Sequence, residues 1–337
     1  MARTAEEHAV WLAQVAEPAL EPERPICDPH HHFWRDSFLS NAAYLLDDLL
    51  DDAKDHNVVS TVFIECLAEY RTEGVEALRP VGETEFVEAI ASQCAAAGHR
   101  TQAAKGIVGF ADLLLGDGVG AVLDAHMAVS KRFRGIRHAG GWDASNNVRN
   151  SHTKPFEHLF LDTTFRRGLA QLAPRRLTFE AWLYHTQIAE LTDLARAFPD
   201  TTIILNHYGG PLGIGPYEGR AQEVFEVWKP AIAELAGCPN VVAKLGGLAM
   251  TLNGFGWHKR ERPPGSEELA DQQRPYVMHM IDCFGPQRCM FESNFPVDKV
   301  SVGYTVLWNA FKRLAAIFSE DEKAALFHDT ATRVYRL

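Results

Sequence analysis

Three consecutive histidines stand in the segment CDPHHHFW, residues 27–34, and Asp28 lies two positions before the first of them. If this segment is a β-strand, alternate side chains share a face, so His30 and His32 point one way and His31 the other. Two imidazoles from one strand and a third from another form a nitrogen-rich ligand set that suits zinc or a similar divalent cation. A short motif alone is only a hypothesis, so the residues that converge on it must decide.

Ionisable or amide side chains also stand at the ends of other apolar runs. They are Glu65, Arg137, His138, His185, Asn206, His207, Lys244, Glu292 and Asn294. A soluble core rarely tolerates so many ionisable groups at converging positions without a function. The planar guanidinium of Arg137 suits a substrate carboxylate or polarised carbonyl, and a salt bridge to Glu65 or Asp143 is its structural alternative.

Short β-branched or apolar runs alternate with amphipathic segments along the chain, which predicts strands that alternate with helices. The predicted strands are residues 26–33, 58–66, 106–113, 132–138, 177–185, 202–207, 240–248 and 289–294. Pro275 is predicted at the first position of a helix that ends before Gly285. Ser319 and Glu322 have the spacing of a capping box and predict the start of the last helix.

Eight strands that are each followed by a helix predict an α/β fold, a closed parallel (β/α)₈ barrel. We expect a single barrel domain over residues 26–337 and a helical N-terminal extension over residues 1–25. An open doubly wound sheet is the alternative, but no Gly-x-Gly-x-x-Gly follows the first strand. In such a barrel the chemistry takes place at the carboxyl ends of the strands, where the polar residues above are found.

Composition excludes several classes of function. The formal net charge is −11, which argues against nucleic acid or an anionic membrane as a partner. No apolar run approaches the roughly 18 residues of a membrane helix, and the acidic N-terminus does not resemble a secretion signal. The six cysteines are scattered and include no C-x-x-C pair, so we expect a cytoplasmic protein with mostly buried thiols.

Two long connecting segments, residues 139–156 and 249–274, follow the fourth and seventh predicted strands and should cover the pocket. Aromatic side chains are frequent near this end of the barrel and suggest a pocket for a flat or apolar ring. They are Phe33, Trp34, Trp142, Tyr184, Tyr208, Phe255, Trp257 and Phe295. We expect Trp34, Tyr184 and Trp257, together with His138 and His258, to contact substrate beside Arg137.

The D-x-H-x-H motif at residues 28–32, His185, the L-N-H run at 205–207 and segment 289–298 resemble the amidohydrolase superfamily. More narrowly, the chain is similar to a branch of TIM-barrel hydrolases that includes sugar lactonases and 2-pyrone-4,6-dicarboxylate hydrolases. The resemblance covers roughly residues 25–337 at the level of strand order. Its most specific pieces are DPHHHFW, FRGIRH, FPDTTIILNHYGGP and VVAKLGGL.

The resemblance implies that His30, His32 and His185 bind a divalent metal, with Zn²⁺ as the first choice, and that His207 lies close by. It also implies an acidic residue at the end of the eighth strand, within a segment of the type S-D-x-P. This chain has Asn294 at that position. An asparagine cannot accept a proton and is a weak metal ligand, so the metal dependence of the site is left open.

Glu292, Asp298 and His207 are the candidates to replace the missing acid as proton acceptor. Glu292 lies two residues before Asn294 and therefore shares its inward face, whereas Asp298 is on the loop beyond. A buried ion pair with Lys244 is the structural alternative for Glu292.

These features predict a hydrolase that adds water to a lactone, an ester or a related carbonyl of a small-molecule substrate, in a metal-assisted or histidine-cluster site. A metal-dependent decarboxylase that acts on a carboxylated ring is one alternative, because related barrels use the same ligands for that reaction. A ligand-binding barrel without catalysis is the other alternative. Assembly into a homo-oligomer is left open.

Overall fold

The structure, a computed structural model, describes residues 3–36 and 42–337. Within these residues the strands form one parallel sheet in chain order. They are β1 (Ile26–His31), β2 (Val58–Ile64), β3 (Gln102–Gly109), β4 (Phe133–Arg137), β5 (Thr178–Ala181), β6 (Ile203–Leu205), β7 (Val241–Leu245) and β8 (Cys289–Phe291). Each of the eight predicted strands is confirmed, although most are shorter than expected.

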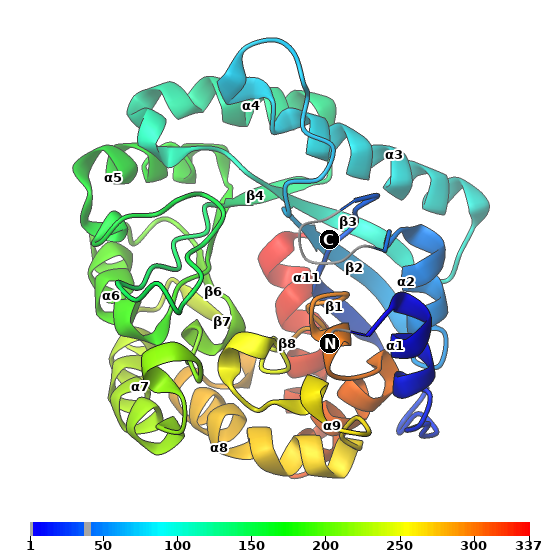
Figure 1. Cartoon of the computed structure of the whole chain (residues 1–337). Helices are drawn as coiled ribbons and strands as arrows, with labels where there is room; N and C mark the ends of the chain where they lie inside the picture. Colours follow the sequence, from blue (N-terminus) through cyan, green and yellow to red (C-terminus); the bar gives the residue numbers. More distant parts are fainter. Residues whose placement is uncertain (1–2, 37–41) are drawn as a thin grey trace.

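Most of the helices surround the strands as an outer ring, whereas α11 lies near the centre of the barrel (Figure 1). The helices are α1 (Ala5–Leu12), α2 (Leu46–Ala53), α3 (Val81–Ala97), α4 (Val119–Val129), α5 (Thr163–Leu169), α6 (Ile188–Ala197), α7 (Ala221–Ala236), α8 (Ser266–Phe284), α9 (Tyr304–Ala315), α10 (Glu320–Ala324) and α11 (Thr330–Tyr335). In the part of the chain that the structure describes, no helix is long and apolar enough to cross a membrane.

The barrel closes between β1 and the segment that follows β8. The backbone N–H of Asn294 donates to the carbonyl of His30 at 2.9 Å, and the N–H of His32 donates to the carbonyl of Phe295 at 2.8 Å. The Asp28 carboxylate accepts a hydrogen bond from the Ser293 N–H at 2.9 Å. The predicted (β/α)₈ barrel is therefore confirmed, and its seam places segment 292–295 against the histidine strand.

Helix boundaries agree with the sequence at one place and differ at another. Ser319 and Glu322 form the predicted capping box at the start of α10. The prediction for Pro275 is wrong, because α8 begins at Ser266 and Pro275 lies inside the helix. The turns before the proline bury Leu269, and this packing stabilises helical turns that a proline rule alone would not predict.

The apolar core has two parts. The larger part lies mainly between the strands and the outer helices. The smaller part joins inward residues of the strands, such as Val62 and Ile204, to Val334 and Tyr335 of α11. Figure 1 shows α11 close to the barrel axis. The short C-terminal helix thus packs over one end of the barrel.

The N-terminal segment packs against the connecting loop that precedes α8. Arg3 donates to the carbonyls of His258 and Arg260, both at 2.7 Å. The indole N–H of Trp11 in α1 donates to the carbonyl of Arg260 at 3.1 Å. Residues 1 and 2 of the predicted extension lie outside the described residues. The part that is described braces a loop at the mouth of the barrel.

Candidate metal centre and active site

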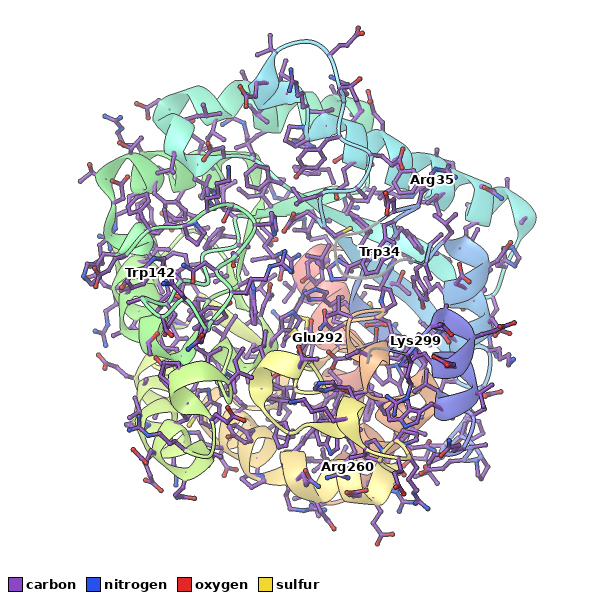
Figure 2. The ribbon with its side chains drawn as sticks, in the orientation of Figure 1. Trp34, Arg35, Trp142, Arg260, Glu292 and Lys299 are labelled. Carbon is purple, nitrogen blue, oxygen red and sulfur yellow. The ribbon has the colours of Figure 1, made fainter. Side chains whose placement is uncertain are left out.

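Three buried side chains meet at the carboxyl end of the barrel: His30 from β1, His207 after β6 and Glu292 after β8. Figure 2 shows Glu292 near the middle of the molecule. One Glu292 carboxylate oxygen lies 2.8 Å from His30 Nδ1, and the other lies 2.6 Å from His207 Nδ1. The ligand atoms of the three residues are all within 4.8 Å of one another.

Glu292 supports the view that this group suits a cation. Its two oxygens are buried, and neither has a hydrogen-bond donor in good geometry among the described residues. The two imidazole nitrogens lie at contact distance but outside hydrogen-bond geometry. A buried carboxylate without donors is costly, and a divalent cation between two imidazoles and one carboxylate would satisfy it. His30, His207 and Glu292 therefore fit a zinc-like ion.

Burial sets the protonation of this group. The pKa values of His30 and His207 are well below the usual value because burial disfavours the cation, and Lys244 and Arg137 add repulsion. Burial also raises the pKa of Glu292 to about 8, although Lys244 opposes the shift. Neutral imidazoles can donate a lone pair to a cation, and a bound cation would favour the ionised form of Glu292.

Two glycines after β7 create the space that this group occupies. A Cβ at Gly246 would lie 2.4 Å from Glu292 Cγ, and one at Gly247 would lie 2.3 Å from His207 Nδ1. Gly247 also has φ +86°, a conformation that other residues rarely adopt. The K-L-G-G run is thus a requirement of the site, because side chains there would displace His207 and Glu292.

The structure places His32 beside the cluster. His32 Nδ1 lies 2.8 Å from the carbonyl of Ile64. A carbonyl can only accept, so Nδ1 carries the proton and Nε2 keeps its lone pair. The pKa of His32 is well below its usual value because of burial and the Arg137 charge. Trp34 stacks on His32 at 6.0 Å and is fully buried, so it contacts the site through His32.

His185 lies away from these ligand atoms. It follows β5 in a short 3₁₀ turn (His185–Gln187), packs edge-on against Tyr217 at 5.0 Å and accepts a hydrogen bond from the Leu212 N–H at 3.4 Å. Burial lowers its pKa to about 4. Within the described residues the three-atom group contains His207 and Glu292 in place of His32 and His185. The ligand roles of His32 and His185 stay predictions.

Arg137 contacts the cluster and a buried carboxylate at the same time. Its Nη1 lies 3.4 Å from His30 Nε2, and its Nε donates to Glu65 at 2.7 Å. Glu65 also lies 3.2 Å from Nε2 of His152. Burial disfavours the ionised Glu65, but His152 and Arg137 outweigh this effect and lower its pKa to about 2. The salt bridge proposed as the structural alternative for Arg137 is therefore present.

Asn294 and Asp298 form a buried pair. The Asn294 amide donates to Asp298 at 2.9 Å, and the Ala249 N–H donates to the other Asp298 oxygen at 3.2 Å. Asn294 has φ +55°, which asparagine tolerates better than most residues. Burial raises the pKa of Asp298 to about 8. These contacts hold the segment after β8 against residues 247–249.

The predicted substrate-binding residues occupy different surroundings. His138 packs edge-on against Phe110 and Phe165 and accepts a hydrogen bond from the Leu113 N–H, so it faces the outer helices. Trp257 is buried and stacks on Phe255 at 4.4 Å. The hydroxyl of Tyr184 donates to the carbonyl of Arg149, and the carbonyl of His258 accepts from Arg3. Their substrate contacts stay predictions.

Sequence reasoning missed Glu180 and His152. Glu180 is fully buried inside β5 and lies 2.9 Å from Lys244 Nζ. A single acidic residue within an apolar strand was a usable signal for it. His152 is on the connecting segment after β4, where no periodic pattern indicates which side chains turn inward. The expected pairing of Glu292 with Lys244 is present but long, at 3.7 Å.

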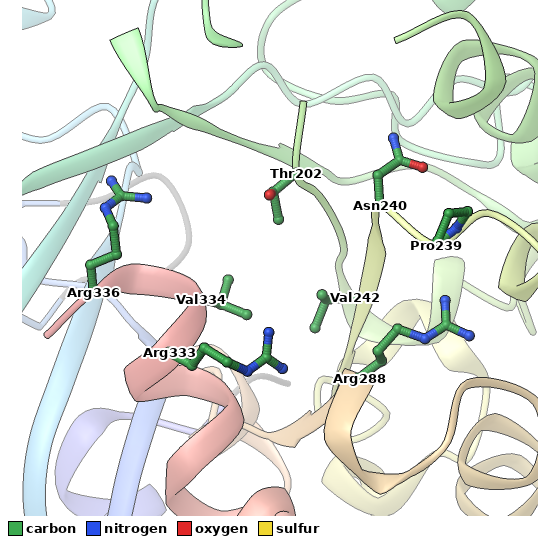
Figure 3. Close-up of a pocket in the computed structure, with 8 residues that line it drawn as sticks. All are labelled: Thr202, Pro239, Asn240, Val242, Arg288, Arg333, Val334 and Arg336. Carbon is green, nitrogen blue, oxygen red and sulfur yellow. The ribbon is translucent and has the colours of Figure 1, made fainter. Parts of the chain in front are cut away.

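A separate hollow of about 260 Å³ lies at the opposite end of the barrel (Figure 3). The residues that line it come from the starts of strands and from α11. They are Thr202, Pro239, Asn240, Val242, Arg288, Arg333, Val334 and Arg336. None of the predicted site residues is among them, so this hollow is distinct from the candidate metal centre.

A parallel (β/α)₈ barrel with a buried His–His–Glu group at the carboxyl ends of its strands is the arrangement of a metal-dependent hydrolase. Residues 27–337 match the family model described as Amidohydrolase. The chain belongs to the amidohydrolase family. The family expected from the motifs is therefore confirmed.

The chain is 35% identical to the uncharacterized protein y4mH of Sinorhizobium fredii, over 93% of this chain and 98% of that protein. It is 26% identical to an L-fucono-1,5-lactonase of Burkholderia ambifaria, over 92% of this chain and 95% of the lactonase. A crystal structure of a Burkholderia multivorans amidohydrolase with bound zinc has the same fold. Its TM-score is 0.71 at 23% identity, and the match covers 93% of this chain and 99% of that one.

Proposed function

We propose that this enzyme hydrolyses the ester bond of a lactone or a related cyclic carbonyl compound, at the site formed by His30, His207 and Glu292. The observation that carries the proposal is the buried Glu292 carboxylate, which lies between two neutral imidazoles and has no hydrogen-bond donor in good geometry among the residues that the structure describes. A divalent ion such as zinc, when bound there, would polarise the carbonyl and lower the pKa of the attacking water.

The residues of the chain have separate roles in this proposal. His30 and His207 would hold the cation through neutral imidazole nitrogens, and Glu292 would contribute its carboxylate and accept the proton of the attacking water. Arg137, which contacts His30 at 3.4 Å, orients an oxygen or carboxylate of the substrate. His32 keeps an acceptor nitrogen at the edge of the cluster and is available for a second proton transfer.

The surroundings support a small oxygen-rich cyclic substrate. Trp182 packs edge-on against His207 at 4.9 Å, and Trp34 stacks on His32. Aromatic faces beside a charged centre suit a ring that carries polar substituents. The relationship to an L-fucono-1,5-lactonase along 92% of the chain favours a sugar lactone over a linear ester. His185, Tyr184, Trp257 and His258 are proposed to line the entrance, and His138 to support it from outside the barrel.

The test combines metal analysis with a substrate panel. The purified protein should contain near-stoichiometric divalent metal and should open sugar 1,4- or 1,5-lactones or a carboxylated pyrone, with acid release as the readout. Glu292→Gln preserves the shape of the side chain but removes its charge, so metal content should fall and kcat/KM should drop by roughly 10²–10⁴-fold. Glu85→Gln, at an exposed surface ion pair, is the matched control and should retain activity.

Two results would contradict the proposal. Release of CO₂ from a carboxylated ring, without ring opening of any lactone, would make the protein a decarboxylase. Tight binding of panel compounds without turnover of any of them would make it a binding barrel.

A further inference from the structure

Below the candidate metal centre lies a buried charge pair that the proposed hydrolysis does not use. Lys244 Nζ is 2.9 Å from Glu180 and 3.7 Å from Glu292, and it lies 3.4 Å from His30 Nδ1. The side chains of Lys244, Glu180, Glu292 and His30 are all fully buried. The amine end of Lys244 therefore contacts two of the three groups that would hold a metal.

Glu180 is held from two other directions. The Tyr335 hydroxyl of α11 and the Asn206 side-chain amide both donate hydrogen bonds to it, one to each carboxylate oxygen. The ammonium of Lys244 also lies 5.5 Å from the centre of the Tyr335 ring. Because Glu180 is anchored to Asn206, directly after β6, and to the C-terminal helix, it keeps Lys244 at the floor of the site and draws it away from Glu292.

From this geometry we infer that Lys244 is an internal counter-cation of the metal centre. Its ammonium compensates the Glu292 carboxylate when no metal is bound and repels a divalent ion when one binds. The ammonium and the divalent ion thus compete for the Glu292 carboxylate. Glu180 weakens the ammonium as a competitor, because it holds the ammonium at 2.9 Å. The inference rests on the proposed metal centre and adds two residues that determine how tightly that centre binds its ion.

Replacement of Lys244 and replacement of Glu180 should change the affinity for zinc in opposite directions, because the two side chains carry opposite charges. Lys244→Met removes a positive charge next to the ligands and leaves Glu180 negative, so zinc should bind about tenfold more tightly or better. Glu180→Gln removes the charge that holds Lys244 back, so the ammonium can move onto Glu292 and zinc should bind about tenfold more weakly or worse. A residue with a merely structural role would not give opposite signs, because loss of packing weakens binding in both cases.

The measurement is the dissociation constant of Zn²⁺ for the full-length metal-stripped protein, from competition with a chromophoric chelator at one pH. Two variants serve as matched controls. Lys312→Met removes another buried lysine, which binds the carbonyls of Leu20 and Glu21. Asp52→Asn removes another carboxylate that is held by a tyrosine hydroxyl and a lysine, Tyr44 and Lys299. Both controls should bind zinc as the wild type does.

Removal of Lys244 leaves the buried Glu180 carboxylate without its counter-charge, so that variant is also the least certain to fold. The double variant Lys244→Met/Glu180→Gln removes both charges together and tests the same inference. Its zinc affinity should fall between those of the two single variants. The thermal midpoint of each metal-stripped protein, measured in parallel, shows whether it is folded.

The outcomes separate this inference from the proposed function. If Lys244→Met and Glu180→Gln both weaken zinc binding, the inference is overturned and the metal centre stands. If the wild type binds no zinc but Lys244→Met does, Lys244 replaces the ion, which supports the inference and sinks metal-assisted hydrolysis. If neither the wild type nor any variant binds zinc, both are overturned.

Discussion

Arg137 has a catalytic and a structural interpretation at once, because one guanidinium contacts both His30 and Glu65. Its forked donors reach the side chain and the carbonyl of Glu65, while Nη1 faces the imidazole of His30. Only 7% of the residue is exposed. A lysine at this position would keep the charge but could not make these contacts together.

For Arg137→Lys we expect kcat/KM to fall by roughly 10²-fold or more, because the substrate-orienting fork is lost. Steady-state kinetics on the best lactone of the panel, with a thermal melt of the same sample, measures both roles. An unchanged kcat/KM with a lower melting temperature would assign Arg137 to the Glu65 salt bridge alone. Arg71→Lys, at the exposed pair with Glu85, is the control and should leave kcat/KM unchanged.

At the scale of elements, helix α1 and the loop at the mouth of the barrel form one unit. Trp11 is 3% exposed and donates to the carbonyl of Arg260, and the guanidinium of Arg3 lies over its ring at 4.3 Å. The same loop carries Trp257 and His258, both predicted to contact substrate. The N-terminal helix therefore supports the loop that the proposed pocket uses.

Trp11→Ala should destabilise the protein by roughly 3 kcal/mol, as expected when a buried tryptophan is truncated. It should also raise KM several-fold, because the loop loses the support of α1. Trp11→Phe keeps most of the packing and loses only the hydrogen bond to Arg260, so both effects should be smaller. The comparison needs urea unfolding and steady-state kinetics. A large loss of stability with an unchanged KM would mean that residues 257–260 do not contribute to the pocket.

The whole molecule contains many histidines that are neutral because they are buried. Burial lowers the pKa to about 3 for His31 and to about 4 for His56, His126, His138 and His185. For such groups the folded state binds fewer protons than the unfolded chain. Their contribution to stability is therefore complete above about pH 6.5 and is lost as the pH falls towards 4.

Buried carboxyls whose pKa is raised act in the opposite direction. Burial raises the pKa of Glu83 to about 8, with repulsion from Glu65 as a further cause. A raised pKa contributes stability below about pH 4.5, and this is lost as the pH rises towards 8. Between pH 4.5 and 6.5 the histidines and these carboxyls change the free energy of unfolding in opposite directions. The pH dependence of the wild type alone therefore does not separate them, and a single histidine variant does.

His126 is the clearest case to test. Its Nε2 lies 3.0 Å from the carbonyl of Phe110, and its Nδ1 lies 2.8 Å from the Thr84 hydroxyl, which fits the neutral ring. His126→Gln should lower the free energy of unfolding at pH 7. Between pH 6.5 and pH 4, the free energy of unfolding of the variant should decrease by roughly 3 kcal/mol less than that of the wild type. Urea unfolding of both proteins across this range measures the difference. Parallel curves would show that His126 does not titrate on unfolding.

The sequence by itself determined the architecture and the edge of the barrel at which the candidate site lies. Alternation of apolar strands and amphipathic helices depends on local patterns, and these predicted eight strands and the Ser319 capping box correctly. The same alternation put His30 and Glu292 on inward faces. Local patterns gave a wrong helix start in α8, where the turns that bury Leu269 begin the helix before Pro275.

Only the tertiary structure decided which polar side chains meet. Strand alternation assigns a face, but it does not give the height of a side chain along the barrel axis or the path of the loop beyond each strand. Those depend on strand stagger, on the space that Gly246 and Gly247 leave, and on the seam between β1 and β8. For these reasons His207 joins His30 and Glu292, while His185 packs on Tyr217.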